Sequence, residues 1–273
     1  MLRGYYSAAS SMLAQQRRQE SLSNNLANVN TPGYKADQGS LRAFPEMLLA
    51  RSETKTIPTK KTLTLPMRSE IGALNTGVYM QEVAPNFSQG DVRETNMTTD
   101  VALVNGDIPD ENGGLFFTVE NIQGETRYTR NGNFTVDPEG YLTTQQGLYV
   151  LDENANRIQT DGMEFTISSE GVLTSNGQAT PLGIAYTADA NQMVKEGQDL
   201  FRMEGGQAPV NARGVAGVQF SSKQGFLEGS NVDSGQTMTE MMASYRLFET
   251  NQKVLKAYDQ SMDKAVNEIG VVR

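Results

Sequence analysis

The chain has 273 residues, 37% of them hydrophobic, and a formal net charge of −9. It is long enough and apolar enough for a packed core, which excludes a disordered protein. Because it contains no cysteine and no histidine, it cannot form disulfides, thiolate or histidine-based nucleophiles, or the common zinc and haem sites.

The charge is unevenly distributed along the chain. Residues 1–61 carry a net charge of +5, residues 62–236 carry −14, and residues 237–273 are balanced. An acidic middle repels phosphate backbones, so we expect no nucleic-acid partner. No run of about 18 apolar residues occurs, and Arg17 and Arg18 fall where a signal peptide keeps its apolar segment. We therefore expect neither a membrane span nor a cleaved signal peptide.

The first predicted element is a helix that begins near Leu2 and ends before the turn Asn30–Tyr34. Pro32 disfavours helical geometry at Thr31, and Pro-Gly is the pair preferred at the centre of a type II turn. The helix is therefore expected to stop abruptly.

Asparagine is unusually frequent at the end of this helix. Four asparagines within residues 24–30 lower local helix stability, so either a contact outside the helix compensates or the helix frays before the turn. In the first alternative Leu22, Leu26 and Val29 face a partner, and the amides of Asn25 and Asn28 bond across the interface and fix its register. The two alternatives have about equal weight from the sequence.

No single period holds from residue 35 to about residue 85, where prolines recur among threonines and basic residues. We interpret this stretch as a connector, with a short helix near Phe44–Arg51 and extended pieces such as Thr62–Pro66.

The middle of the chain is predicted to be all-β. Turn pairs recur at spacings typical of hairpins: Asn105-Gly106, Gly113-Gly114, Asn131-Gly132, Glu139-Gly140, Glu170-Gly171 and Asn176-Gly177. Phe134–Thr143 also aligns with Phe165–Thr174 at an offset of 31 residues, with six of ten positions identical. This repeat indicates a duplicated hairpin.

The sequence contains few candidates for catalytic, metal-binding or nucleotide-binding residues. The stretch Asp152–Asn156 imitates the start of a calcium-binding loop, but Arg157 replaces the required glycine and Met163 the bidentate glutamate, so we reject a calcium site. No phosphate-binding glycine motif occurs, and no pair of acidic residues stands out from solvated surface charge. We expect no enzyme activity, no cofactor and no metal.

The last predicted element is a long helix with a heptad seam. Steps of three and four residues give Met238, Met241, Tyr245, Phe248, Gln252, Leu255, Asp259, Met262, Val266 and Ile269, eight of them apolar. A seam that keeps this period winds around a partner helix. It spans about 48 Å, too long for one face of a small β domain. The helix therefore needs partners.

The predicted fold class is α+β, with N- and C-terminal helices forming a coiled-coil-like assembly region around a central all-β domain. The predicted segments are an N-terminal assembly helix and turn (1–34), a connector (35–91), the central β domain (92–230) and a C-terminal assembly helix (231–273).

Three blocks of this sequence resemble those of the flagellar basal-body rod and hook axial proteins. The first is Ser21–Lys35, the second is Tyr128–Asp137 with Gly140 and Leu142, and the third begins at Gly225–Asp233. The third block continues through Met241, Arg246–Asn251 and Lys253–Leu255. The blocks are long, ordered and spread over nearly the whole chain, so the resemblance is highly specific.

The resemblance implies a structural subunit of the rod, similar to the distal-rod proteins, which polymerises through its terminal helices into a tubular filament that transmits torque. It also implies partners among copies of itself and other rod and hook proteins, export through the flagellar type III apparatus without a cleaved signal, and an extracytoplasmic place in the basal body. By this resemblance, subunit contacts are expected at Asn24, Asn25, Asn28, Asn30, Thr31, Pro32, Gly33 and Tyr34, and a coiled-coil core at the heptad positions from Met238 onward.

Two departures from the family pattern leave the position in the rod or hook open. Asp107–Gly114 is longer than the usual turn, and Ser234–Gln236 interrupts the usual apolar lead into the last helix. Two other functional classes also stay open: a trimeric coiled-coil fibre or adhesin, and an envelope carbohydrate-binding protein or hydrolase.

Overall fold

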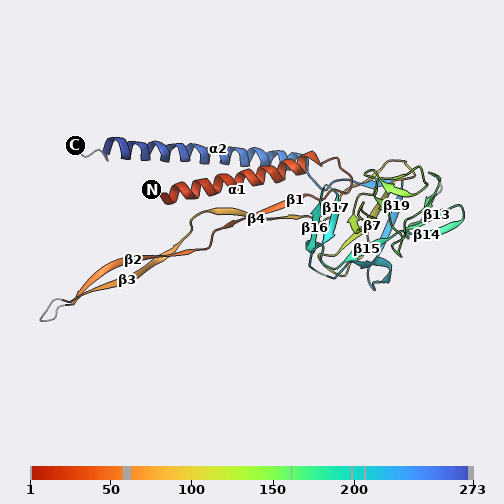
Figure 1. Cartoon of the computed structure of the whole chain (residues 1–273), viewed down its shortest axis with the longest axis horizontal. Coiled ribbons are helices and arrows are strands. Elements are labelled where there is room, and N and C mark those ends of the chain that lie inside the picture. The colour runs from red at the N-terminus through yellow and green to blue at the C-terminus, as the bar shows by residue number, and fades with distance from the viewer. Residues whose placement is uncertain (1, 58–62, 161, 198, 206, 270–273) are drawn as a thin grey trace. The chain divides into compact units, whose positions relative to one another are not determined.

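The computed structural model describes residues 2–57, 63–160, 162–197, 199–205 and 207–269. The chain divides into two compact units built from segments that are distant in sequence. Residues 1–23, 39–83 and 238–273 form the helical unit, and residues 24–38 and 84–237 form the β unit. The fold is mixed, with a helix near each end of the chain and a β-rich middle, which confirms this part of the prediction (Figure 1).

Two long helices occupy the ends of the chain. Helix α1 spans Leu2–Ala27, and helix α2 spans Ser234–Lys264 and continues into a π-helical turn at Ala265–Ile269. The carboxylate of Asp233 caps α2 by accepting a hydrogen bond from the Gln236 amide at 3.0 Å. In the part of the chain that the structure describes, neither helix is apolar enough over 18 residues to cross a bilayer.

The predicted helix near Phe44–Arg51 is wrong. Strand β2 (Met47–Ile57) instead pairs antiparallel with β3 (Leu63–Leu74), with a register shift between Leu49 and Ala50. Pairing over the length of two strands outweighs the weak local preference for one helical turn. The extended piece is confirmed from Leu63 to Pro66, whereas Thr62 lies outside the described residues.

The strands from β5 to β20 build the β unit. Its main sheet runs β16 (Met193–Glu196), β17 (Leu200–Met203), β8 (Thr126–Thr129), β7 (Gly114–Glu120), β11 (Tyr149–Val150), β10 (Leu142–Thr144) and β9 (Phe134–Val136). Strand β15 (Ile184–Thr187) also pairs with β7 and with β18 (Val210–Asn211). Smaller sheets pair β12 (Thr166–Ile167), β13 (Val172–Ser175) and β14 (Gln178–Pro181), then β19 (Phe220–Gln224) with β6 (Val101–Asn105), and β20 (Phe226–Glu228) with β5 (Val92–Glu94). Strand β1 (Asp37–Ala43) pairs with β4 (Val78–Pro85).

Strand β7 carries the core on both of its faces. Leu115, Phe117 and Val119 point into one buried hydrophobic cluster, whereas Phe116 packs with Phe201 in a second cluster. Successive side chains of a strand alternate between faces, so the run of three apolar residues Leu115–Phe117 indicates a strand covered on both sides.

The duplicated hairpin is confirmed in detail. Strands β9 and β10 pair Val136 with Leu142, and strands β12 and β13 pair Ile167 with Leu173, so both registers are related by the predicted offset. The turns match as well, because Gly140 and Gly171 both lie in the left-handed region at φ values of 86° and 74°. Glycine adopts this conformation without the clash of a Cβ atom.

Candidate functional site

Helices α1 and α2 run antiparallel and contact each other within the helical unit (Figure 1). The Ser244 hydroxyl lies 2.9 Å from Gln15 Oε1, and the Asn251 amide donates to the Ser11 hydroxyl at 2.9 Å. Arg18 and Glu240 form an exposed ion pair at 3.2 Å. Polar pairs therefore contribute to this helix interface.

The predicted heptad seam divides between two faces of α2. Met241, Phe248, Leu255 and Met262 are half-buried and lie on the same side as Ser244 and Asn251. In contrast, Met238 and Tyr245 of α2 are 48% and 55% exposed, and Val266, in the π-helical turn, is 68% exposed. The sequence pattern missed this division because the positions that contact α1 include polar residues, which a search for apolar spacing passes over. Ile269 ends the π-helical turn.

The turn after α1 adopts the predicted geometry. The Tyr34 amide donates to the Thr31 carbonyl at 3.3 Å, with Pro32 and Gly33 at the two central positions and a Gly33 φ of 69°. Leu22, Asn25, Gly33 and Tyr34 are buried, Leu26, Asn28, Val29, Thr31 and Pro32 are half-buried, and Asn24 and Asn30 are exposed.

The amides proposed to bond across an interface are used inside the chain. Asn25 donates to the Asp37 carbonyl at 2.9 Å and accepts from the Asp37 amide at 2.7 Å. Asn28 donates to the Asn24 carbonyl and accepts from the Thr31 hydroxyl. These bonds compensate for the low helix propensity of asparagine, so the end of α1 is an ordered turn.

A second set of contacts surrounds Tyr34. The Lys195 ammonium lies 3.7 Å from the centre of the Tyr34 ring and forms an ion pair with Asp37 at 3.0 Å. It also donates to the Lys35 carbonyl at 3.1 Å. Burial raises the pKa of the Tyr34 hydroxyl, and the neighbouring Asp37 carboxylate raises it further, so Tyr34 acts here as a neutral donor and aromatic surface.

Three charged side chains meet in the interior of the β unit. Glu228 accepts from the Lys35 ammonium at 2.7 Å through Oε1 and from Arg130 Nε at 2.5 Å through Oε2. The side chains of all three are only 1–2% exposed. We call this group the Glu228 clasp, and we define it as Lys35, Arg130 and Glu228.

The clasp joins the three blocks on which the family resemblance rests. Lys35 belongs to the first block, Arg130 to the second and Glu228 to the third. Sequence reasoning did not single out these charges, because a lysine and a glutamate 193 residues apart look like ordinary surface residues. The signal that could have found them is that each block contains at least one charged residue among its family-like positions.

Gly33 sits where no side chain fits, and this leads to a prediction. A Cβ atom would lie 2.4 Å from the Asn131 nitrogen and 2.5 Å from the Arg130 carbonyl carbon, both of them backbone atoms. We expect Gly33→Ala to lower the free energy of unfolding by about 2–3 kcal/mol in urea titrations.

Gly177→Ala is the matched control for this substitution. Gly177 also has a positive φ, 78°, but no atom of the described residues lies within 4 Å of the position that a Cβ atom would take there. Only about 1 kcal/mol of backbone strain is therefore expected. Equal losses for the two variants would contradict the close approach of Gly33 to residues 130 and 131.

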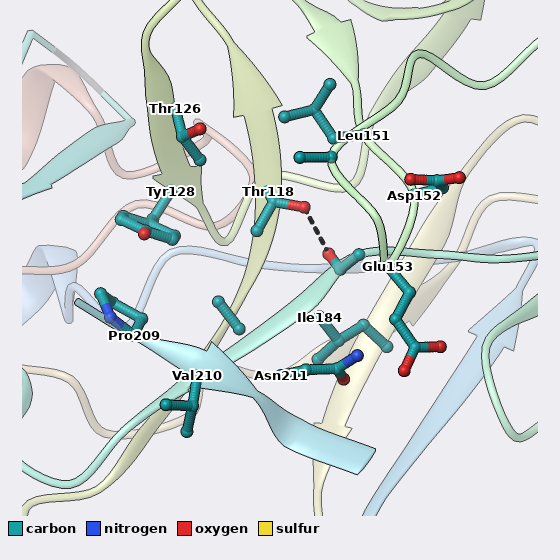
Figure 2. A pocket seen from close by; sticks show the side chains of 13 residues that line it. Thr118, Thr126, Tyr128, Leu151, Asp152, Glu153, Ile184, Pro209, Val210 and Asn211 are labelled. Atoms are coloured by element: carbon teal, nitrogen blue, oxygen red, sulfur yellow. Dashed lines mark hydrogen bonds between the residues drawn. The ribbon is translucent and has the colours of Figure 1, made fainter. Parts of the chain in front are cut away.

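An open pocket of about 160 Å³ lies in the β unit beside β7, β8, β15 and β18. Thr118, which lines the pocket, donates to the Gly183 carbonyl at 3.0 Å, the bond drawn as a dashed line in Figure 2. The carboxylate of Asp152, at its edge, accepts from the amides of Asn154 and Asn156 at 2.8 and 2.7 Å. The calcium-loop-like spacing of this stretch is therefore a turn that Asp152 closes itself.

Three family models match the chain. "Flagella basal body rod protein" covers residues 6–35, "Flagellar hook protein FlgE/F/G D1 domain" covers residues 112–175, and "Flagellar basal body rod FlgEFG protein C-terminal" covers residues 223–268. The first and last of these matched ranges contain Lys35 and Glu228, and the middle one contains Arg130.

Whole-length relatives agree with these matches. The chain is 45% identical to the flagellar hook-basal body complex protein FlhO of Bacillus subtilis, with 100% of both chains covered. It is 33% identical to the flagellar basal-body rod protein FlgG of Agrobacterium fabrum over 93% of this chain and 94% of the relative. It is 30% identical to FlgG of Bacillus subtilis over 98% and 99%. The chain therefore belongs to the family of flagellar hook and basal-body rod proteins, which are structural proteins and not enzymes.

Proposed function

We propose that this rod-family protein polymerises through the faces of α1 and α2 that its own helix pair leaves uncovered. The supporting observation is a stripe of large apolar side chains on α2, in which Met238, Met242 and Tyr245 are 48%, 58% and 55% exposed. Their spacing of four and three residues places them on one side of the helix. On α1, Tyr6 and Leu13 are likewise exposed, at 64% and 59%.

Such surfaces suit contacts between copies in coiled-coil-like layers. Apolar residues at helical spacing, left in water by the chain's own fold, are the usual mark of a protein interface. Because a head-to-tail contact that does not close generates a helical filament, the uncovered helix faces support a tubular axial filament. Leu26, Val29 and Asn30, at the end of α1 and at least partly exposed, are proposed to extend this contact.

We further propose the place and partners that the family resemblance implies. The relatives' names, hook-basal body complex protein and basal-body rod protein, support contacts with other rod and hook proteins. Transmission of torque, export through the flagellar type III apparatus without a cleaved signal, and an extracytoplasmic location are part of the same proposal. Purified hook-basal bodies labelled with an antibody to a tagged copy of this chain are expected to carry the label on the rod or at its junction with the hook. Label only in soluble or wall fractions would contradict the proposal.

The assembly surface is tested at Tyr245. Tyr245→Asp is expected to abolish filament growth of the purified chain, measured by light scattering and electron microscopy, because an unpaired carboxylate would be buried between copies. Tyr245→Phe keeps the apolar ring and is expected to assemble within about twofold of the parent rate, since a rim hydroxyl contributes little.

Two outcomes would overturn the assembly surface. Growth of the Tyr245→Asp variant at the parent rate would show that this face is not the contact. A parent chain that forms only particles of one discrete mass, with no growth at high concentration, would favour a closed bundle over a filament.

A further inference from the structure

Segments of the chain that are far apart in sequence converge on one carboxylate. Besides Lys35 and Arg130, the Gly90 amide donates to Glu228 Oε1 at 3.0 Å. The backbone joins the same place, because the Gly33 amide donates to the Glu228 carbonyl at 2.8 Å. Glu228 is thus bonded to the turn after α1, to the loop before β5 and to the end of β8.

The two cations of the clasp have different supporting contacts. Arg130 donates to the carbonyls of Leu115 and Leu103 at 2.6 and 2.7 Å and to Asn105 Oδ1 at 2.6 Å, so three of its bonds lie within the β strands and their ends. Lys35 donates, besides Glu228, to the Ser88 carbonyl at 2.8 Å. Arg130 is therefore embedded in the β unit, whereas the lysine belongs to the segment that docks onto it.

Glu228 is the single negative charge in the clasp, and it balances two positive charges. The pKa of the Lys35 ammonium is lowered to about 8, chiefly by burial; the charge of Glu228 raises this pKa and the charge of Arg130 lowers it. Burial alone would raise the pKa of Glu228, but the charges of Arg130 and Lys35 hold it below its usual value. Loss of the carboxylate would leave two unpaired cations in the interior, and this would lower the free energy of unfolding far more than loss of Lys35 would.

We propose that the Glu228 clasp is a non-covalent cross-link that holds residues 24–38 on the rest of the β unit as a separately releasable segment. In a chain without cysteine, it takes the role that a disulfide between distant segments would otherwise have. The clasp accordingly assigns Lys35, together with Gly33 and Tyr34, to the chain's internal connection. This inference does not depend on the proposed assembly surface.

Release of this segment is expected to be local. Among the residues that the structure describes, neither hydrophobic cluster of the β unit includes a member of 24–38. Polar contacts hold the segment instead, among them the clasp, Lys195 against the Tyr34 ring, and Asn231, whose side chain accepts from the Ala36 amide at 2.7 Å. The Asn86 amide also donates to the Ala36 carbonyl at 2.8 Å. Segments that contribute few apolar contacts are those that open below the global unfolding free energy.

Hydrogen exchange of the full chain, followed by mass spectrometry, tests the clasp. In Glu228→Gln, amide exchange over residues 24–38 is expected to accelerate by at least about a hundredfold, whereas peptides from β7 and β8 keep parent rates. Lys35→Met is expected to accelerate exchange less than about tenfold, because Arg130 and the Gly90 amide still satisfy Glu228. In the double variant Glu228→Gln with Lys35→Met, the exchange rate over residues 24–38 is expected to lie between those of the two single variants, since only one unpaired cation remains buried.

Several results would overturn the clasp. Parent-like exchange over residues 24–38 in Glu228→Gln would show that Glu228 does not hold the segment. Equal effects of Glu228→Gln and Lys35→Met would indicate a simple ion pair rather than a three-way cross-link.

A measurement on the unaltered chain covers the case in which Glu228→Gln fails to fold. In exchange at rising, sub-denaturing urea, residues 24–38 are expected to open as one unit at lower free energy than β7 and β8. If residues 24–38, β7 and β8 all opened at one common free energy, the segment would not be separately releasable, and the proposal would be overturned.

Discussion

Arg130→Met is expected to lower the free energy of unfolding of the β unit by about 3–5 kcal/mol. The substitution keeps much of the side-chain volume but removes every donor of the guanidinium. The Leu103 and Leu115 carbonyls each lose a hydrogen bond from a charged donor, and such bonds contribute about 1.5–3 kcal/mol. Glu228 keeps only Lys35 as a charged partner. Urea titration of the full chain, followed by circular dichroism, measures the loss.

Arg127→Met is the matched control for this change. Arg127 lies on β8, three residues before Arg130, and pairs with Glu125 and Glu196, whose side chains are 59% and 51% exposed. The Arg127 side chain is only 10% exposed, but its ion pairs reach partners in solvent, where such pairs contribute about 0–1 kcal/mol, so the control is expected to lose much less stability than Arg130→Met. If both variants lost a similar free energy of unfolding, the effect of Arg130→Met would not come from the burial of its ion pair with Glu228.

The parts of the fold that the sequence predicted are those encoded locally. Pro32 and Gly33 end α1 by their own backbone preferences, and the turn found there has the expected type. The duplicated hairpin could be located because its copies repeat the same short pattern around Gly140 and Gly171. Each of these features depends on residues within about ten positions of one another.

The parts that could not be predicted depend on pairing between distant residues. The ribbon of β2 and β3 replaced a predicted helical turn at Phe44–Arg51, because its register is set by a partner strand and not by local preference. The clasp was missed for the same reason: the burial of Lys35 and Glu228 follows from tertiary structure, and charged residues are by default expected at the surface.

Helix α2 combines a feature that the sequence predicted with one that depends on a distant part of the chain. Periodicity correctly indicated a long helix, and the structure places Phe248 and Leu255 on the side that faces α1. It could not indicate that Ser244 and Asn251 complete this contact while Tyr245 stays exposed. A polar residue contributes nothing to an apolar pattern, although its hydrogen bonds fix which helix it contacts.

Phe248→Asp is expected to separate α1 from α2 and, as a consequence, to stop assembly while the β unit stays folded. Phe248 is half-buried between Ser244 and Asn251 on the α1-facing side, and a carboxylate there would lose hydration without gaining a cation. Because the chain has no cysteine, Ser11→Cys and Asn251→Cys can be bridged selectively by a short bifunctional thiol reagent; the two native side chains are 2.9 Å apart. The bridged fraction is expected to fall at least about tenfold when Phe248→Asp is added, and Leu255→Asp is expected to act likewise.

Tyr245→Asp is the control that separates the two faces of α2, since it should leave the bridging unchanged and still block filament growth. If Phe248→Asp bridged and assembled like the parent, the α1-facing side of α2 would not be needed for either step.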